Sequence, residues 1–379
     1  MQITGIKLHK IEIPLASEFY TMHSKKPFRK FQEYLVEITT HAGKIGFGSC
    51  WFKNFNPEWE NFIETKVAPF ILNKNIDQVL VKNFVNRFYY KQNQTQNIPL
   101  PSCLEIALWD LIGKKHKKPI YKLLGGKKNR IKPYASLLEP SSKMSIKKWI
   151  YLIEQTYKKG FRAAKLHIGT NKIDPYYIVD VVKNIRKKRD DIDLMIDVMQ
   201  SWKTNCIGLQ KAKILAQKLE KYNVKWLEEP LPYIDSSETS SILAKLVNID
   251  IAGGGRLSNP IIFEEILKNN SLDIIQPDIQ NTGGIYQTIK ISEIAKKYNK
   301  KCIPHFYGTN IGFIATLHTC GVINSPYIEY PYHPPYITSG TIFALLDKPI
   351  ILEKDGYVKI PEKPGLGINL DETWTDYIV

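Results

Sequence analysis

Apolar and polar side chains alternate along the first 55 or so residues, and turn residues separate the alternating stretches. A period of two is typical of strands with one buried face. It predicts one strand over residues 3–13 and a hairpin whose two arms are residues 34–38 and 44–48. The residues between the arms, 41–43, include a glycine, as tight turns often do.

The period changes to that of a helix between about residues 57 and 126. Apolar side chains recur there three and four residues apart, as at Leu104, Ala107, Leu108, Leu111 and Ile112. The preceding residues, 101–102, suit a helix start. A run of strands followed by a run of helices predicts an α+β domain, which we place at residues 1–130.

A repeating unit begins near residue 132, with a short apolar segment followed by a longer amphipathic one. The apolar segments predict strands that end 24 to 32 residues apart, at Ser136, Lys165, Asp197, Glu228, Ala252, Asp278, His305 and Glu329. This spacing is the usual length of a βα unit, and eight strands match a (β/α)₈ barrel. An open doubly wound sheet would carry a glycine-rich fingerprint after its first strand, and none follows here.

We therefore predict an α/β protein with a TIM-type barrel at residues 131–349. After about residue 350 the chain returns to short strand-like pieces. These residues, about 350–379, are expected to fold back on the first domain and complete it.

Ionisable side chains occur at six of the eight predicted strand ends. They are Lys165, His167, Asp197, Glu228, Glu229, Asp278, His305 and Glu329. A single aspartate in such a place is most often a helix cap, and a single lysine is most often solvated. The carboxyl ends of barrel strands, however, form one face where active sites are built. Carboxylates gathered there with lysine and histidine indicate metal-assisted proton transfer.

The chain has 379 residues and a formal net charge of +16. Its lysines occur in short scattered clusters, such as 187–188 and 300–301, with no aromatic-interleaved basic stripe. We therefore expect no nucleic-acid partner. The apolar runs are far shorter than the roughly 18 residues that cross a bilayer, so we expect no membrane partner. The five cysteines form no Cys-x-x-Cys pair, which predicts reduced thiols in a cytoplasmic protein.

Several sequence blocks resemble the mandelate racemase subgroup of the enolase superfamily, also called the mandelate racemase/muconate lactonizing enzyme family. The blocks are residues 106–114 with 122–126, 226–230, 275–278 with 283–284, and 328–330, and their order covers nearly the whole chain. The resemblance implies a modified (β/α)₇β barrel under a capping domain built from both termini. It also implies Mg²⁺ and abstraction of the proton α to a carboxylate.

Carried over by position along the chain, the resemblance implies five catalytic residues: Lys165, His167, Asp278, His305 and Glu329. His305 matches the general acid/base, and Asp278 matches the partner that fixes its tautomer. Lys165 matches the first lysine of a Lys-x-Lys pair beside the substrate carboxylate, and Glu329 a glutamate that hydrogen-bonds this carboxylate. The second lysine of the pair is replaced by His167, which remains a competent base.

The resemblance also implies that Asp197 and Glu228 bind the metal. The family's third metal carboxylate falls on Gly255, which supplies no ligand. We therefore expect Mg²⁺ to bind weakly without substrate, because one anion is missing beside the cation. Replacing Gly255 with glutamate should then restore tighter binding. A less favoured alternative is that Arg256 brings a cation to the place of the metal.

Three functions remain open. The leading one is an acid-sugar dehydratase, a lyase acting on a small anionic carboxylic acid. The second is a racemase or epimerase of an α-substituted acid, with His167 and His305 on opposite faces of one carbon. The third is a catalytically silent relative that binds an acid, for which Gly255 is the best support. We expect a homo-oligomer. The segments 19–30 and 51–56 are expected to set specificity.

Overall fold

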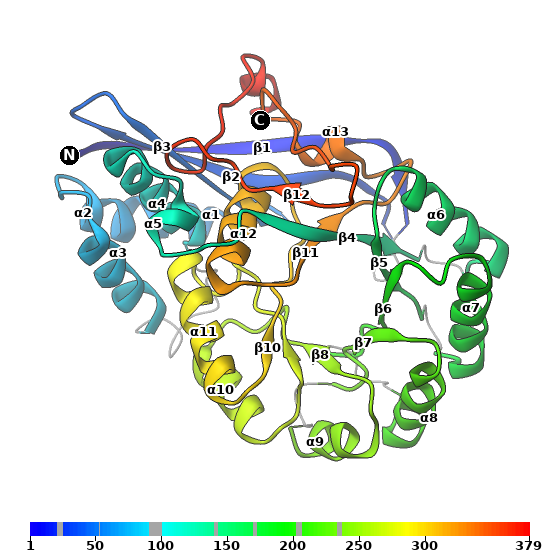
Figure 1. Cartoon of the computed structure of the whole chain (residues 1–379). Helices are drawn as coiled ribbons and strands as arrows, with labels where there is room; N and C mark the ends of the chain where they lie inside the picture. The colour runs from blue at the N-terminus through cyan, green and yellow to red at the C-terminus, as the bar shows by residue number, and fades with distance from the viewer. Residues whose placement is uncertain are drawn as a thin grey trace.

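The computed structural model describes residues 1–20, 26–52, 54–90, 101–139, 143–169, 173–201, 207–232 and 237–379. An antiparallel sheet with its helices lies beside a ring of parallel strands that is surrounded by helices (Figure 1). Among the described residues, no helix has both the length and the apolar character needed to cross a membrane.

The antiparallel sheet contains β1 (Ile3–Phe19), β2 (Phe28–Thr40) and β3 (Ile45–Phe52), in that order. The predicted hairpin is confirmed, because β2 pairs with β3 through a turn in which Gly43 has a φ of 69°. The predicted first strand is longer than residues 3–13, because β1 resumes its pairing with β2 at Phe19 after an irregularity that follows Pro14.

Helical segments follow this sheet along the chain. They are α1 (Pro57–Phe62), the π-helix η1 (Ile63–Val67), α2 (Ala68–Ile71), α3 (Gln78–Val85), the π-helix η2 (Asn86–Tyr90), α4 (Ser102–His116) and α5 (Ile120–Leu123). Helix α4 is buried on all sides from Ser102 to Gly113. It lies very close to β3 at Gly48. A Cβ on this residue would be only 1.8 Å from the carbonyl oxygen of Cys103. Only glycine fits this contact.

The predicted eight parallel strands are present. They are β4 (Arg130–Leu138), β5 (Ala163–His167), β6 (Asp193–Asp197), β7 (Val224–Glu228), β8 (Ile251–Gly253), β9 (Ile274–Ile275), β10 (Lys301–Cys302) and β11 (Tyr327–Pro331). Their hydrogen-bonded order is β10-β9-β8-β7-β6-β5-β4-β11. Where the two ends of this path meet, the N–H of Phe306 donates to Oε2 of Glu329 at 3.2 Å.

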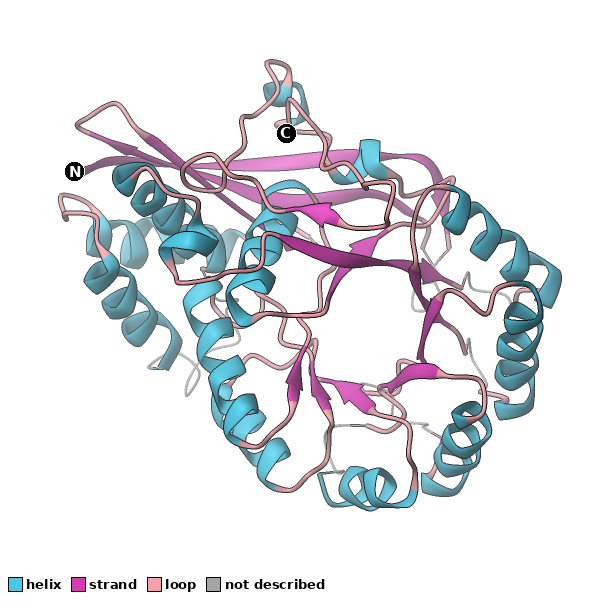
Figure 2. Ribbon diagram, viewed as in Figure 1, coloured by secondary structure: helices cyan, strands magenta, loops and turns pink. Residues whose placement is uncertain are grey.

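One helix separates each pair of successive strands within the described residues. These helices are α6 (Ile146–Lys158), α7 (Pro175–Lys188), α8 (Leu209–Glu220), α9 (Ser237–Leu246), α10 (Pro260–Lys268), α11 (Ile285–Lys297) and α12 (Asn310–Ile323). They surround the ring of strands (Figure 2). The arrangement is the predicted modified (β/α)₇β barrel. Strands β9 and β10 are shorter than predicted, so Asp278 and His305 lie in the loops just after them.

The end of the chain contains α13 (Ser339–Ile342), β12 (Val358–Lys359) and the 3₁₀ helix η3 (Trp374–Tyr377). Strand β12 pairs antiparallel with β4, at the barrel. Farther along, Ile378 bridges Ile11, and the N–H of Val379 donates to the carbonyl of Lys10 at 3.0 Å. The tail therefore contacts the first sheet, as the sequence predicted.

A layer of apolar side chains fills the interior of the barrel near the amino ends of its strands. It consists of Tyr134, Ala163, Met195, Trp226, Ala252, Ile274 and Ile303. Residues two positions apart on a strand face the same side. The residues two positions after this layer therefore also face the interior, at the carboxyl ends of the strands, where the predicted site residues occur.

Candidate active site

The predicted site residues gather at the carboxyl ends of the strands, inside the barrel. Lys165 follows Ala163 by two positions on β5, Asp197 follows Met195 on β6, and Glu228 follows Trp226 on β7. Contacts of 4.0 Å or less join five of them in the order His167, Asp197, Lys165, Glu329 and His305. Glu228 also contacts Lys165, and Asp278 contacts His305. The structure thus brings all seven residues into one cluster.

Lys165 lies at the centre of three carboxylates. Its Nζ is 2.6 Å from Oε1 of Glu228, 2.9 Å from Oε1 of Glu329 and 4.0 Å from Oδ2 of Asp197. The side chain is completely buried. Burial alone lowers the pKa of Lys165, but the surrounding carboxylates outweigh it and raise the pKa above its usual value. Lys165 is therefore an ammonium ion in this cluster.

Asp197 already accepts hydrogen bonds at both of its oxygens. The N–H of Met199 donates to Oδ1 at 2.8 Å, and Nε2 of His167 lies 3.1 Å from Oδ2. Burial raises the pKa of Asp197, but His167 and Lys165 lower it below its usual value. The other nitrogen of His167, Nδ1, lies 3.2 Å from the carbonyl oxygen of Leu137. Both ring nitrogens of His167 therefore face acceptor oxygens, and one contact must change before a ring nitrogen can face a substrate.

Glu228, like Asp197, accepts hydrogen bonds at both of its carboxylate oxygens. Lys165 donates to Oε1, while Nε1 of Trp226 and Nε2 of Gln276 each donate to Oε2 at 2.8 Å. Burial raises the pKa of Glu228, and Lys165 opposes this effect. All four oxygens of Asp197 and Glu228 thus contact a donor from the protein.

His305 forms the predicted pair with Asp278. Its Nδ1 lies 2.7 Å from Oδ2 of Asp278, whose other oxygen accepts from the N–H of Gln280 at 2.8 Å. An Nδ1–H donated to Asp278 leaves Nε2 to exchange a proton with a substrate. Burial lowers the pKa of His305, but Glu329 and Asp278 together raise it to about 9. The imidazole is therefore protonated at neutral pH.

Glu329 accepts hydrogen bonds from several elements. Ser136 Oγ donates to Oε1 at 2.7 Å, and Tyr134 OH donates to Oε2 at 3.1 Å. Burial raises the pKa of Glu329, but Lys165 and His305 lower it to about 2. An ionised carboxylate only accepts hydrogen bonds. Glu329 would need a proton before it could donate to a substrate carboxylate, the role that the resemblance implied.

The residues of this site do not fit a resident Mg²⁺ ion. Mg²⁺ takes oxygen ligands in near-octahedral geometry. Among the described residues, no group of three or more histidine, cysteine, aspartate or glutamate side chains is arranged to hold a metal. The oxygens of Asp197 and Glu228 already contact donors, and the centre of the carboxylates is taken by the Lys165 ammonium.

The position of Gly255 explains why a third carboxylate is missing. A Cβ on Gly255 would lie 2.9 Å from both Cγ and Cδ2 of His305, so the imidazole ring occupies the space of a side chain. In Gly255→Glu the His305 ring would have to shift, and whether this variant binds Mg²⁺ more tightly stays a prediction. The alternative that Arg256 replaces the metal is wrong, because Arg256 is exposed while Lys165 lies among the carboxylates.

Sequence reasoning missed four residues that complete the cluster: Tyr134, Ser136, Trp226 and Gln276 donate to its carboxylates. Trp226 and Gln276 lie two positions before Glu228 and Asp278. Counting back in steps of two along each predicted strand would have found them.

The first domain reaches the barrel next to His305. The N–H of Trp51 donates to Oε1 of Gln280 at 2.5 Å, and the ring of Trp51 contacts that of Tyr307 edge-on at 5.5 Å. The predicted specificity segment 51–56 thus touches the barrel near the site, although residue 53 lies outside the described residues. The same holds for residues 21–25 of the other predicted segment, 19–30.

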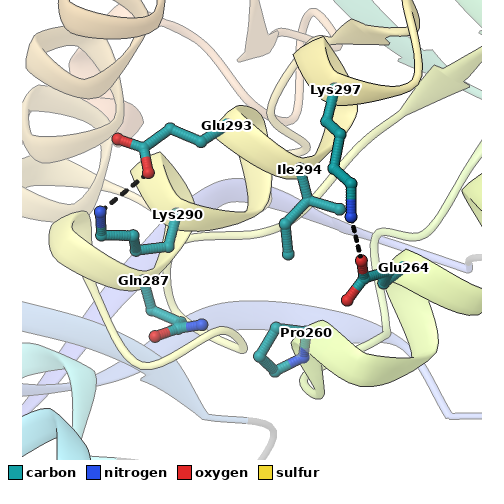
Figure 3. Close-up of a pocket in the computed structure, with 7 residues that line it drawn as sticks. All are labelled: Pro260, Glu264, Gln287, Lys290, Glu293, Ile294 and Lys297. Carbon is teal, nitrogen blue, oxygen red and sulfur yellow. Dashed lines mark hydrogen bonds and ion pairs between the residues drawn. The ribbon is translucent and has the colours of Figure 1, made fainter.

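The groove in Figure 3 lies elsewhere, between α10 and α11, and contains none of the predicted site residues. Its lysines form ion pairs with neighbouring carboxylates. Lys297 contacts Glu264 at 3.0 Å, and Lys290 contacts Glu293 at 2.8 Å. These four side chains are largely exposed, so the groove has the character of ordinary surface.

Comparison with protein families identifies both parts of the chain. The family model described as "Enolase C-terminal domain-like" matches residues 150–374. The model described as "Mandelate racemase / muconate lactonizing enzyme, N-terminal domain" matches residues 10–125.

Individual relatives cover most of the chain. Arabinonate dehydratase from Saccharolobus solfataricus is 29% identical over 350 residues, which are 90% of this chain and 89% of the relative. N-succinyl-L-Arg/Lys racemase from Bacillus cereus is 23% identical over 386 residues, 98% and 96% of the two chains. A crystal structure of L-talarate/galactarate dehydratase from Salmonella typhimurium, liganded with Mg and L-lyxarohydroxamate, superposes with a TM-score of 0.83 at 23% identity. It covers 100% of this chain and 93% of that chain, which shows the shared fold.

Proposed function

The chain belongs to the mandelate racemase subgroup of the enolase superfamily, and we propose on this basis that it abstracts the proton α to a carboxylate as an acid-sugar dehydratase. The observation that carries the proposal is the hydrogen bond of 2.7 Å between His305 and Asp278 at the barrel mouth. It fixes the imidazole so that Nε2 exchanges the proton. The substrate is a small anionic carboxylic acid, in line with the acid-sugar dehydratases among its relatives.

Dehydration removes a proton from Cα and hydroxide from Cβ of the substrate. A base takes the Cα proton, and an acid protonates the departing hydroxyl, so that water and an enol leave the site. The enol then becomes a 2-keto acid. His305 is the acid, because its pKa of about 9 keeps it protonated at neutral pH. His167 is the candidate base, once one of its two acceptor contacts is exchanged.

Racemisation is the second candidate. His167 and His305 lie at opposite ends of the contact chain through Asp197, Lys165 and Glu329. Two imidazoles on opposite faces of one carbon would remove a proton from one side and return it from the other. A racemase incorporates solvent deuterium into recovered substrate, whereas a dehydratase forms a 2-keto acid.

A catalytically silent acid-binding relative is the candidate from another class. It is favoured by the donors that already engage the oxygens of Asp197 and Glu228. Solved relatives hold magnesium. For this chain, however, we expect weak Mg²⁺ binding, because both carboxylates would have to exchange these donors for the ion. A homo-oligomer also remains a prediction.

A substrate screen in deuterated water tests these candidates together. The wild-type protein is incubated with a panel of sugar acids that includes arabinonate, xylonate, gluconate and galactarate, with and without MgCl₂. We expect a 2-keto acid from at least one of them. Deuterium in recovered substrate without a keto acid would favour racemisation, and binding without either would favour the silent relative.

A further inference from the structure

The carboxylates of the site surround a positive charge that belongs to the chain itself. The Lys165 ammonium lies within 3 Å of one oxygen of Glu228 and one of Glu329, with Asp197 at 4.0 Å. The lysine is completely buried, so no solvent shell screens these charges. A divalent cation at the same point would have to displace the ammonium, because two cations cannot share it.

Hydrogen bonds hold the carboxylates in this arrangement. Trp226 and Gln276 fix one side of Glu228, and Ser136 and Tyr134 fix Glu329. Oε1 of Glu228 lies 2.6 Å from the ammonium, and Oε1 of Glu329, which also accepts from Ser136, lies 2.9 Å from it. The cluster is therefore organised around Lys165, with rigid donors behind each acceptor.

Among the described residues, no group of three or more metal-ligating side chains is arranged to hold an ion. The position that the resemblance assigns to the third ligand is Gly255, and a Cβ there would lie 2.9 Å from the His305 ring. The missing carboxylate at Gly255 and the buried ammonium of Lys165 are two separate features, and both disfavour a divalent cation in this site.

We propose that the Lys165 ammonium takes the place of the divalent cation in this active site, so that the site works without bound Mg²⁺. The statement about catalysis rests on the proposed function, but the statement about the cation does not. Lys165 supplies the positive charge that balances the three carboxylates, and proton transfer by His305 proceeds beside it.

The direct test compares divalent-cation binding by the wild type and Lys165→Met. Methionine keeps the length of the side chain and removes its charge. Mn²⁺ binding is measured by electron paramagnetic resonance, and Mg²⁺ binding by calorimetry, after treatment with chelator. We expect the wild type to bind Mg²⁺ no more tightly than about 1 mM. Lys165→Met should bind Mn²⁺ at least about tenfold more tightly than the wild type, because three carboxylates then lack a counter-charge.

Two further variants serve as controls. Lys165→Arg retains the charge and should not gain cation affinity. Lys132→Ala removes a lysine from the other end of the barrel, where it pairs with Asp193 at 2.6 Å, and should not gain affinity either. If Lys165→Met is folded only when Mg²⁺ or Mn²⁺ is present, as followed by its melting temperature, that result supports the proposal. If it stays unfolded with both ions, the wild-type titration decides alone.

Micromolar Mg²⁺ binding by the wild type would overturn the proposal, and so would equal Mn²⁺ affinity in the wild type and a folded Lys165→Met. Activity measurements provide a second, independent test of whether the site needs Mg²⁺. Turnover of a sugar acid should be the same in chelator and in MgCl₂, and turnover lost in chelator but restored by MgCl₂ would also overturn it. If no sugar acid is turned over under any condition, the proposed function fails, while the binding comparison still decides the role of Lys165.

Discussion

Two halves of the site differ in how closely they follow the family pattern. We call Asp278, His305 and Glu329 the acid–base half, and Lys165, Asp197 and Glu228 the cation half. In the acid–base half the expected pair is in place, with 2.7 Å between His305 and Asp278. In the cation half the expected carboxylates are present but contact donors from the protein. A residue that matches the family pattern therefore predicts where its side chain lies better than which partner the side chain binds.

The physical difference is the number of partners that each function needs. A histidine that exchanges a proton with substrate needs one acceptor to fix its tautomer, and two strand ends suffice to place the pair. A metal site needs several oxygens that converge on one point and remain free of other donors. At Gly255 the expected third carboxylate is absent, and the His305 ring lies where a side chain would begin. The following predictions test whether the two halves are as different as this suggests.

The largest effect is expected in the acid–base half. His305→Asn keeps a hydrogen-bonding side chain but removes the proton-transfer group, so turnover should fall by about 10²–10⁴. Activity is measured with whichever sugar acid the screen identifies. His116→Asn, which changes an exposed histidine at the end of α4, should have no effect. A loss of less than about tenfold in His305→Asn would remove His305 from the chemistry.

The pH dependence of stability should also come from the acid–base half. The folded-state pKa of His305, about 9, lies above its usual 6.5. The native state therefore holds this proton more tightly, and the resulting stability is complete below pH 6.5 and lost as pH rises through 9. The loss is at most about 3 kcal/mol.

Denaturant unfolding at pH 6, 7.5, 9 and 10 measures this loss for the wild type and His305→Asn. The difference between the two proteins should shrink as the pH rises, and dehydration should weaken above pH 9 as the acid loses its proton. A constant difference across this range would show that the proton of His305 is not linked to folding.

A smaller effect is expected where the two halves meet, at Gly255. Gly255→Ala places a Cβ 2.9 Å from the His305 ring, so the ring must shift and the protein should lose about 1–3 kcal/mol of stability. Turnover should fall as well, since the ring moves relative to Asp278. Gly208→Ala is the matched control, because a Cβ there meets no atom within 4 Å. Equal stability of the two variants in denaturant unfolding would show that the contact with His305 is easily relieved.

Much of the fold was predictable because it depends on period and spacing. The hairpin between β2 and β3, the eight parallel strands and the helix starting at Ser102 all follow from apolar repeats. The lengths of β9 and β10 were not predictable, since only two residues of each apolar segment pair with the neighbouring strands. The division into residues 1–130 with 350–379 and residues 131–349 remains a prediction.

The site was predictable as a set of residues but not as a network. Strand alternation places Lys165 and His167 on the same face, and both contact Asp197. What Lys165 contacts depends on side chains from three other strands, which no single stretch of sequence contains. The donors behind these carboxylates, such as Tyr134 and Gln276, were missed because only the strand ends were considered and not the positions two residues earlier.

The smallest effect is expected from Tyr134→Phe, which removes one donor from Glu329 and leaves the ring in place. The lost hydrogen bond is 3.1 Å long, and Glu329 keeps Ser136, the N–H of Phe306 and Lys165 as donors. Because Glu329 stays partnered, stability should fall by only about 1 kcal/mol and turnover by less than tenfold. Denaturant unfolding and the dehydration assay measure both. A loss above about 3 kcal/mol would show that the donors of Glu329 act as one cooperative network. The acid–base half would then be held by coupled hydrogen bonds, as we infer for the carboxylates around Lys165.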